Sequence, residues 1–305
     1  MSLLFVILLA LLLDLWLGEP RQYHPLVGFG RLASYLEGKL NREESPARRW
    51  LGAAALGLAL LPLTLLAALL AALPGWGMVV EVLLLYLAIG GSSLAQHGRA
   101  VMAALLAGDL VLARERVAWI VSRDTEALDE TGVASATVES VLENGNDALF
   151  GAIFWFVIFG AAGVVLYRLA NTLDAMWGYR SERYRQFGWA AARFDDLLNW
   201  VPARLTAGAY LLAGDAQRGW RCWREQGARS DSPNAGVVMA AGAGALGLQL
   251  GGPAHYHGRA VDKPWLGEGL SPGAWDIERA IALVRRALLY WLGVILVLAM
   301  LSHVF

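Results

Sequence analysis

RDTEALDETGVASATVESVLENGND, residues 123–147, is the stretch of the chain richest in acids and amides, and it runs directly into the apolar stretch ALFGAIFWFVIFGAAGVVL, residues 148–166. Glu139, Glu143 and Asp147 are spaced four residues apart, so a helix here would place three carboxylates on one face. Like charges in such a row repel each other, and beside a bilayer they favour bound Mg²⁺, arginine side chains or a substrate ammonium. A solvated acidic helix face is the alternative interpretation.

The composition indicates an integral membrane protein. Hydrophobic residues make up 57% of the 305 and charged residues only 17%, which is too apolar for an ordinary soluble domain. A helix needs about 20 apolar residues to cross a bilayer, and the stretches that reach or approach this length are Leu51–Leu73, Met78–Leu94, Ala148–Leu166 and Ala287–Val304. Leu3–Leu17 is shorter and carries Asp14, and we interpret it as a retained anchor.

These stretches predict an all-α, polytopic membrane protein with four to five membrane helices and a largely helical polar region on the cytoplasmic side. We expect residues 1–305 to form a single membrane-embedded domain, with polar segments at about 97–147, 171–204 and 232–284. The turn-forming residues 74–77, PGWG, predict an antiparallel helical hairpin. No alternation of polar and apolar residues is sustained, so we expect no β-strand.

The arginines raise a question about sidedness. Ten of them lie between residues 168 and 229, and the positive-inside bias predicts that this region is cytoplasmic. If the polar connectors before residues 148–166 are also cytoplasmic, a full crossing by that stretch would place the arginine-rich region outside. Because Gly160 and Gly163 interrupt the stretch, we hypothesise a re-entrant or protein-buried hairpin that returns to the same side.

Several common motifs are absent or misleading. GAGALG at residues 242–247 matches the dinucleotide fingerprint, but no strand precedes it and no suitably placed acid follows it. Its small residues are better explained by close helix packing. Cys222 is the only cysteine, which excludes an intramolecular disulfide and a cysteine-based zinc site. The remaining inventory of acids, amides and arginines suits Mg²⁺-dependent handling of anionic substrates.

Several segments together resemble the CobD/CbiB family of cobamide biosynthesis, the adenosylcobinamide-phosphate synthases. The resemblance covers nearly the whole chain in the same motif order, and it rests on Gly18–Arg21 with His24-Pro25, Arg123–Thr125, Ala136–Ser140, Glu143-Asn144, Asn146-Asp147, Asn171–Tyr179, Asp195-Asp196 with Asn199, Pro202–Arg204, and Ser232–Gly236. Glu19, where aspartate is more frequent, and Val237-Val238, where polar residues are expected, depart from the family pattern.

The resemblance implies ATP-dependent formation of an amide. The propionate of (adenosyl)cobyric acid would be joined to aminopropanol or its O-phosphate, with ATP as co-substrate and Mg²⁺ as cofactor, to give (adenosyl)cobinamide or its phosphate. The catalytic candidates are Arg123, Asp124, Glu139, Glu143, Asp174, Asp195 and Asp196. The candidate Mg²⁺ ligands are Asp124, Glu139, Glu143 and Asp147. The substrate-binding candidates are Asn144, Asn146, Tyr179, Tyr184, Arg204, Ser232 and Asn234.

Two other classes of function compete with this interpretation. A non-catalytic membrane sensor has no need of clustered carboxylates flanked by amides, and a corrinoid or cation transporter usually places its ionisable groups within spanning helices. The expected location is the bacterial inner membrane, with the active site facing the cytoplasm. The expected partners are the corrinoid, the amino alcohol or its phosphate, and membrane lipid, without nucleic acid. A homo-oligomer or a complex with other late-pathway cobalamin enzymes is compatible with this picture.

Overall fold

The computed structural model describes residues 2–20, 24–42, 45–179, 181–256 and 259–301. The chain divides into two compact units, of which unit 1 comprises Met1–Gly90 and Asp147–Asn199, and unit 2 comprises Gly91–Asn146 and Trp200–Phe305. Each unit combines two stretches that are far apart in the sequence. The contacts of the chain are thus organised around two centres.

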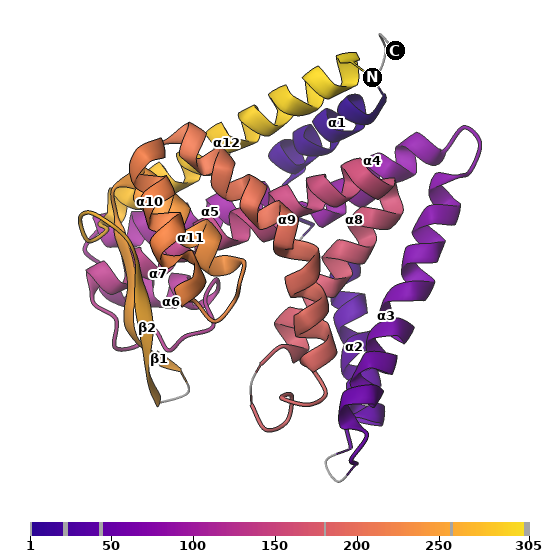
Figure 1. Cartoon of the computed structure of the whole chain (residues 1–305), viewed down its shortest axis with the longest axis horizontal. Helices are drawn as coiled ribbons and strands as arrows, with labels where there is room; N and C mark the ends of the chain where they lie inside the picture. Colours follow the sequence, from indigo (N-terminus) through magenta and orange to yellow (C-terminus); the bar gives the residue numbers. More distant parts are fainter. Residues whose placement is uncertain (1, 21–23, 43–44, 180, 257–258, 302–305) are drawn as a thin grey trace. The chain divides into compact units, whose positions relative to one another are not determined.

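Unit 1 is entirely helical in the part that the structure describes. Its elements, shown in indigo, purple and pink in Figure 1, are α1 (Ser2–Leu17), α2 (Pro25–Leu40), α3 (Arg48–Ala71), α4 (Gly77–Ala88), α8 (Gly151–Trp177) and the first part of α9 (Trp189–Ala213). The helix α2 starts as its sequence predicts. Pro25 occupies the first turn, and the Nδ1 atom of His24 accepts a hydrogen bond from the Leu26 amide at 3.1 Å.

The helices α3 and α4 form the predicted antiparallel hairpin (Figure 1). The connecting turn contains Gly75 at φ +77°, a left-handed conformation that glycine adopts without steric cost. Trp76, in the same turn, is 66% exposed, as expected for an indole at a membrane interface.

The helix α8 reverses direction near its middle. Phe159 has φ −131° and ψ 16°, and Gly160 has φ +59° and ψ −144°, so neither residue is helical. A Cβ atom placed on Gly163 would overlap the Trp155 carbonyl, and one placed on Gly151 would overlap the Tyr167 hydroxyl. In a straight helix, residues eight apart are separated by about 12 Å. The two arms of α8 therefore fold back on each other, as the hairpin hypothesis required.

The end of this fold-back lies beside the start of α3. Asn41 Nδ2 and Arg48 Nη2 both donate hydrogen bonds to the Arg183 carbonyl, at 3.0 and 2.6 Å. The segment that follows α8 is thus located at the same end of α3 as the connector that precedes it. Residues 148–166 therefore do not carry the chain to the opposite end of α3.

Within the described residues, four helical runs are long and apolar enough to cross a membrane, namely Arg48–Ala71, Gly77–Leu106, Glu130–Trp177 and Ala274–Leu301. Together with the helical content, they confirm the predicted polytopic helical fold. Two boundaries differ from the prediction. The second run breaks at Ile89, where ψ is 151°, and the last helix begins at Ala274 rather than Ala287.

Unit 2 contains the remaining elements. These are α5 (Gly91–Leu106), α6 (Leu110–Ala118), α7 (Glu130–Gly145), the second part of α9, α10 (Ala216–Gln226), the short 3₁₀-helix η2 (Gly227–Arg229), α11 (Ala235–Leu246), β1 (Gln249–Tyr256), β2 (Arg259–Gly267) and α12 (Ala274–Leu301). A π-helical turn, η1 (Asn146–Phe150), joins α7 to α8 across the boundary between the units.

The small residues of α11 serve helix packing, as the sequence predicts. Every residue from Gly236 to Leu246 is buried. A Cβ atom on Gly244 would come within 2.9 Å of both the Cys222 sulfur and the Gly219 Cα of α10. The two helices can approach so closely only because both carry glycine at the crossing.

The expectation that the chain forms no strand is wrong for residues 249–256 and 259–267. The strands β1 and β2 pair antiparallel, with Gln249 opposite Gly267 and a register irregularity between Leu250 and Gly252. Gly251 and Gly252 both have positive φ, +89° and +84°. The irregular backbone and the glycines interrupt the polar–apolar alternation by which a strand is recognised in a sequence.

Candidate functional site

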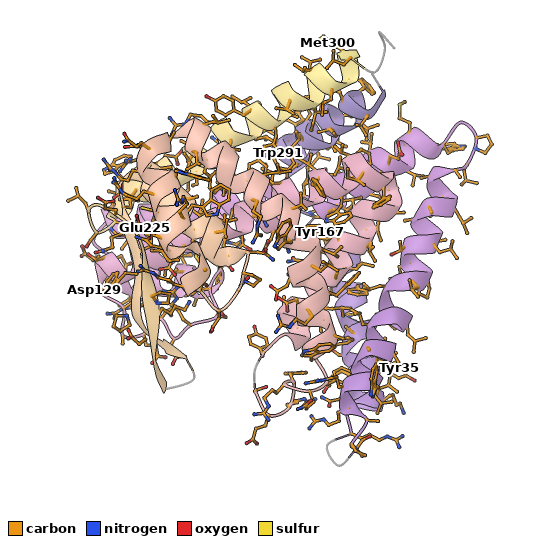
Figure 2. The ribbon with its side chains drawn as sticks, in the orientation of Figure 1. Tyr35, Asp129, Tyr167, Glu225, Trp291 and Met300 are labelled. Carbon is orange, nitrogen blue, oxygen red and sulfur yellow. The ribbon has the colours of Figure 1, made fainter. Side chains whose placement is uncertain are left out.

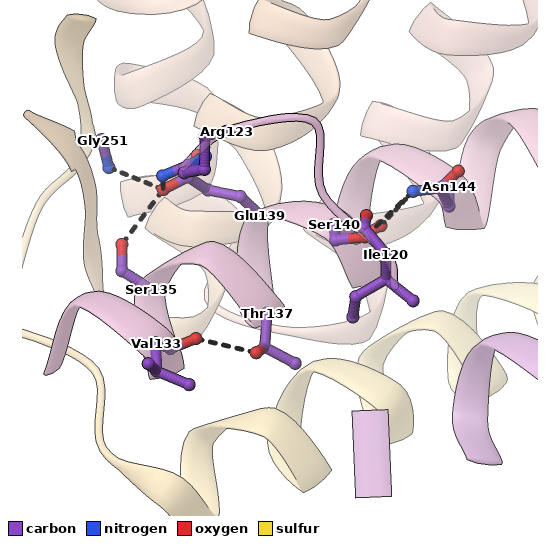
Figure 3. A network of polar contacts seen from close by, with 9 residues as sticks. All are labelled: Ile120, Arg123, Val133, Ser135, Thr137, Glu139, Ser140, Asn144 and Gly251. Atoms are coloured by element: carbon purple, nitrogen blue, oxygen red, sulfur yellow. Dashed lines mark hydrogen bonds and ion pairs between the residues drawn. The ribbon is translucent and has the colours of Figure 1, made fainter. Parts of the chain in front are cut away.

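The first group of predicted site residues surrounds Glu139 on α7, in unit 2. The Asp129 carboxylate caps this helix by accepting a hydrogen bond from the Gly132 amide at 2.7 Å. Glu139 is only 4% exposed and forms an ion pair with Arg123. It also accepts hydrogen bonds from the Ser135 hydroxyl at 3.1 Å and the Gly251 amide at 3.2 Å, as Figure 3 shows.

This arrangement ties the 121–129 loop, α7 and β1 together through one carboxylate. The charge of Glu139 is balanced by a guanidinium, and its oxygens are surrounded by donors. Glu139 therefore fits a structural and charge-positioning role better than the role of a metal ligand.

The predicted acidic face does not continue regularly beyond Glu143. The π-helical turn begins at Asn146, so the residues after it are rotated relative to an ideal α-helix. Asn144 Nδ2 donates to the Ser140 carbonyl at 2.9 Å (Figure 3). Asn146 is 2% exposed, and its Oδ1 accepts a hydrogen bond from the Thr206 hydroxyl at 2.9 Å. Both amides are held in place by protein groups.

Arg204 and the SPNAG turn form a second group within unit 2. Arg204 Nη1 donates to the Asn234 side chain at 3.0 Å, and the guanidinium lies 4.3 Å from the centre of the Trp200 ring. Ser232 Oγ accepts hydrogen bonds from the amides of Asn234 and Ala235 at the start of α11. Burial lowers the pKa of Arg204, although a guanidinium stays charged at neutral pH. Three of the predicted substrate-binding residues, Arg204, Ser232 and Asn234, therefore lie next to one another.

A hydrogen-bonded network of buried polar groups lies in unit 1. Tyr167 on α8, which is labelled in Figure 2, is fully buried and donates to Asn199 Oδ1 at 2.9 Å. Asn199 Nδ2 donates to Asp195 one helical turn away, at 3.1 Å. Asn171 Nδ2 is 3.4 Å from the other oxygen of Asp195, and Arg168 Nη1 is 3.4 Å from Asn171 Oδ1. We call these five residues the unit 1 network.

Asp195 is the central carboxylate of this network and is 8% exposed. Burial raises its pKa well above the ordinary value, and the charges of Asp147 and Asp174 raise it further. The hydrogen bonds from Asn199 and Asn171 oppose this shift only in part. Asp195 makes no ion pair within the described part of the chain, so its charge is stabilised by amides alone.

The remaining candidates have less defined surroundings. Asp124 and Glu143 are half-buried in unit 2, and Asp174 and Asp196 are half-buried in unit 1. Tyr179 is 48% exposed, and Tyr184 is half-buried with the Arg183 guanidinium 5.6 Å from its ring centre. The structure thus places some of the predicted site residues in three groups, around Asp195, Glu139 and Arg204.

The predicted Mg²⁺ ligands are of the right chemical type, but their arrangement does not form a recognisable metal site. Carboxylate and amide oxygens are the ligands that Mg²⁺ prefers. However, no group of three or more His, Cys, Asp or Glu side chains is placed to hold a metal ion in the described ranges. Of the four predicted ligands, Glu139 is the least suited to Mg²⁺, because its oxygens already accept two contacts from Arg123 and one each from Ser135 and Gly251. The carboxylates of Asp124, Glu143 and Asp147 are of the type that binds Mg²⁺.

Sequence reasoning missed part of the unit 1 network as a functional group. Asn171, Asn199 and Arg168 were not predicted as site residues, although Asn199 follows Asp195 at the helical spacing of four. Tyr167 follows the apolar stretch 148–166, and no sequence pattern marks it as a site residue. Its placement becomes visible only when α8 folds back.

Comparison with known proteins supplies the family. The family model described as CobD/Cbib protein matches residues 7–284. The chain is 60% identical over 302 residues to the cobalamin biosynthesis protein CobD of Chromobacterium violaceum, with 96% of each chain covered. The chain belongs to the CobD/CbiB family. It is also 58% identical over 296 residues to CobD of Stutzerimonas stutzeri, covering 97% of this chain and 98% of the relative.

More distant CobD proteins match almost the same length. The cobalamin biosynthesis protein CobD of Mycobacterium tuberculosis is 42% identical over 286 residues, covering 92% of this chain and 90% of the relative. No solved structure matches the chain. Membership of the CobD/CbiB family confirms the resemblance and makes this a protein of cobalamin biosynthesis with membrane-type helices.

Proposed function

We propose that this CobD/CbiB protein is an ATP-dependent ligase that joins the propionate of (adenosyl)cobyric acid to aminopropanol or its O-phosphate. The family match over residues 7–284 is the observation that carries the proposal. The unit 1 network and the Arg123–Glu139 pair support it, because they provide the carboxylates, amides and guanidinium groups that such a reaction requires.

A carboxylate is a poor electrophile, so the propionate must first be activated by ATP. Attack of its oxygen on the γ-phosphorus breaks the bond to ADP and forms an acyl phosphate, whereas attack on the α-phosphorus forms an adenylate and releases pyrophosphate. The amine nitrogen then attacks the acyl carbon, loses a proton, and expels phosphate or AMP. The products are the amide and either ADP with phosphate or AMP with pyrophosphate.

In unit 1, we assign amine binding and proton acceptance to Asp174, Asp195 and Asp196. Asp195 makes no ion pair within the described residues and can attract an ammonium group, and its raised pKa brings it closer to that of an effective general base. The amides of Asn171 and Asn199 orient the Asp195 carboxylate through the hydrogen bonds already described.

In unit 2, we assign phosphoryl or carboxylate binding to Arg123 and Arg204, whose planar guanidinium groups suit both anions. Asp124 and Glu143 of unit 2 are proposed Mg²⁺ ligands, and Asp147 of unit 1 keeps the same proposed role. When bound, Mg²⁺ would neutralise the charge on the nucleotide phosphates. Asn144, Asn146, Ser232, Asn234, Tyr179 and Tyr184 stay assigned to binding the corrinoid or the amino alcohol.

The test is a reaction with the purified full chain. Adenosylcobyric acid, aminopropanol phosphate, Mg²⁺ and ATP are incubated with the protein, and mass spectrometry measures the amide product together with ADP and AMP. Glu143→Gln is expected to abolish product formation without affecting membrane insertion. Glu225→Gln, at an exposed position on α10 that Figure 2 labels, is the matched control with normal turnover.

The outcomes separate the competing classes of function. Nucleotide-dependent amide formation supports the ligase. Binding of the corrinoid without nucleotide cleavage would favour a sensor, and nucleotide-independent corrinoid uptake into vesicles would favour a transporter. Normal turnover in Glu143→Gln would remove Glu143 from the site.

We further propose that the protein is located in the bacterial inner membrane, with its substrate sites facing the cytoplasm, where ATP is available. The contacts of Arg183 with Asn41 and Arg48 support one sidedness for both connectors. In a Cys222→Ala background, Ser45→Cys and Ser181→Cys should both react with an impermeant thiol reagent in inverted vesicles. Trp76→Cys should react only in intact cells whose outer membrane has been permeabilised. Labelling of Ser45→Cys and Ser181→Cys from opposite sides would contradict the fold-back of α8.

A further inference from the structure

An apolar groove lies in unit 1 between α2, α3, α4 and α8, with a cavity volume of about 410 Å³. This volume is within the range of small-molecule sites. Its walls include Leu63, Leu66 and Leu70 of α3 and Leu84 and Leu87 of α4. Both helices belong to runs able to cross a membrane, so lipid chains have access to such a groove.

Only two lining side chains are strongly polar, and both carry hydrogen-bond donors. They are Arg168 of α8 and His24 at the start of α2. Arg168 Nε is buried and has no hydrogen-bond partner within the described residues. An arginine inside a candidate membrane-crossing run calls for a functional explanation, and an unpaired buried donor calls for a ligand that supplies an acceptor.

His24 adds a second donor. Its Nδ1 accepts the hydrogen bond from the Leu26 amide, so in the neutral imidazole the proton is on Nε2. Burial lowers the pKa of His24; the Glu19 carboxylate raises it, and the Arg168 charge lowers it again. The net shift is downward, which favours this neutral form at pH 7. Glu19 lies 3.9 Å from Nε2, but it is 41% exposed and does not line the groove.

We propose that this groove binds one acyl chain of an anionic phospholipid, whose phosphate accepts hydrogen bonds from Arg168 and His24. The apolar walls bury the chain, and the guanidinium at the polar end is complementary to the phosphate. A corrinoid does not suit the groove, because its many amide groups would be buried there without partners. The groove and the unit 1 network share Arg168, whose Nη1 contacts Asn171, but the lipid proposal does not depend on the ligase chemistry.

The experiment uses the full chain in a mild detergent and native mass spectrometry. Phosphatidylglycerol is titrated against phosphatidylcholine with identical acyl chains, so that only the headgroup charge differs. We expect one tightly bound phosphatidylglycerol with at least about tenfold higher affinity than phosphatidylcholine. Arg168→Gln should remove this preference, with a roughly tenfold or larger loss of phosphatidylglycerol affinity. Arg193→Gln, an exposed arginine of α9 in the same unit, should retain it.

A pair of glycines on α2 tests the groove itself. A Cβ atom on Gly28 or on Gly38 meets no atom within 4 Å, but only Gly28 lines the groove. Gly28→Phe should lower the affinity for both lipids about tenfold, whereas Gly38→Phe should leave it unchanged. Equal affinity for the two lipids, equal effects of the two glycine variants, or displacement of the lipid by cobyric acid would overturn the proposal.

Discussion

Asp195 in unit 1 and Glu139 in unit 2 are both buried carboxylates on helices, and they differ in what surrounds them. Glu139 is paired with a guanidinium and accepts hydrogen bonds from a hydroxyl and a backbone amide. Within the described residues, Asp195 accepts hydrogen bonds from two side-chain amides, and the negative charges of Asp147 and Asp174 raise its pKa. Both side chains are buried, with Glu139 4% and Asp195 8% exposed, but only Glu139 is paired with a cation.

The difference separates a structural acid from a candidate catalytic one. A buried pair whose charges cancel holds segments together, and breaking it exposes an uncompensated charge. When a buried acid has no cation beside it, its ionised form is destabilised and its pKa rises. Acids with such raised pKa values are frequent at functional sites. A cationic substrate would supply the charge that Asp195 lacks. The two acids should therefore respond in opposite ways to substitution.

The largest expected effect is on turnover. Asp195→Asn should lower the rate of amide formation by about 100-fold or more, since a general base contributes at least that much. Its free energy of unfolding should stay unchanged or increase, because a buried charge is removed. Product formation by mass spectrometry and unfolding in mixed micelles measure the two effects. Asp215→Asn, at the first turn of α10, is the control because asparagine caps a helix as well as aspartate. Normal turnover in Asp195→Asn would contradict the comparison.

The next effect is on the stability of unit 2. Arg123→Ala should lower the free energy of unfolding by about 3–5 kcal/mol, because Glu139 would be left buried without its partner. The double substitution with Glu139→Ala should cost less than the single one. Arg221→Ala removes the exposed pair with Glu268 and should leave the free energy of unfolding nearly unchanged, because solvent screens that pair. Equal losses for the buried and the exposed pair would show that Glu139 is not held as described.

A smaller effect concerns the turn that brings Tyr167 into the unit 1 network. Gly160 has φ +59° and ψ −144°, so Gly160→Ala should lower the free energy of unfolding by about 1–3 kcal/mol. Gly208 is an ordinary helical position of α9 in unit 2 with open space around it. Gly208→Ala should be neutral or stabilising by up to about 1 kcal/mol. The same sign for both variants would argue against a strained reversal in α8.

The smallest effect is a pH dependence in unit 1. Burial raises the pKa of Glu37, but hydrogen bonds from Arg183 and Asn41 and the charges of Arg183 and Arg48 outweigh it, so the net pKa is lowered from 4.5. A lowered pKa contributes stability above the unfolded value that is lost as pH falls through the folded value. Glu37→Gln should cost about 1 kcal/mol at pH 7, and the difference from wild type should shrink as pH falls below the unfolded pKa and through the lower folded pKa. Melting curves of both proteins across this range provide the measurement; a constant difference would contradict the assignment.

Hydrophobic patterning was enough to predict most of the architecture. The α3–α4 hairpin follows from two apolar runs separated by PGWG, because glycine and proline punctuate such runs locally. The β1–β2 hairpin escaped prediction because its glycines and register irregularity obscure the strand period. The fold-back of α8 was only a hypothesis, since Gly160 and Gly163 permit a turn without requiring one.

For the candidate site, residue chemistry identified acids and arginines but not their partners. In the sequence, Asp195 and Glu139 are both acids within predicted polar segments, and nothing distinguishes their surroundings. Arg123 lies sixteen residues before Glu139, but this spacing does not indicate that the two side chains pair. The pairing of Glu139 with the amide of Gly251 bridges 112 residues of chain, and no local pattern encodes such a contact. The three Mg²⁺ ligands other than Glu139 stay a prediction.

The sequence by itself determined the class of the protein, its apolar helices and its family, because hydrophobic content, turn residues and ordered motifs are local properties of the chain. Only the tertiary structure decided which carboxylate is neutralised and which is not. A buried charge is stabilised or destabilised by whatever lies within a few ångströms of it, and in this protein those neighbours come from distant segments that α8 and the β-hairpin bring into place.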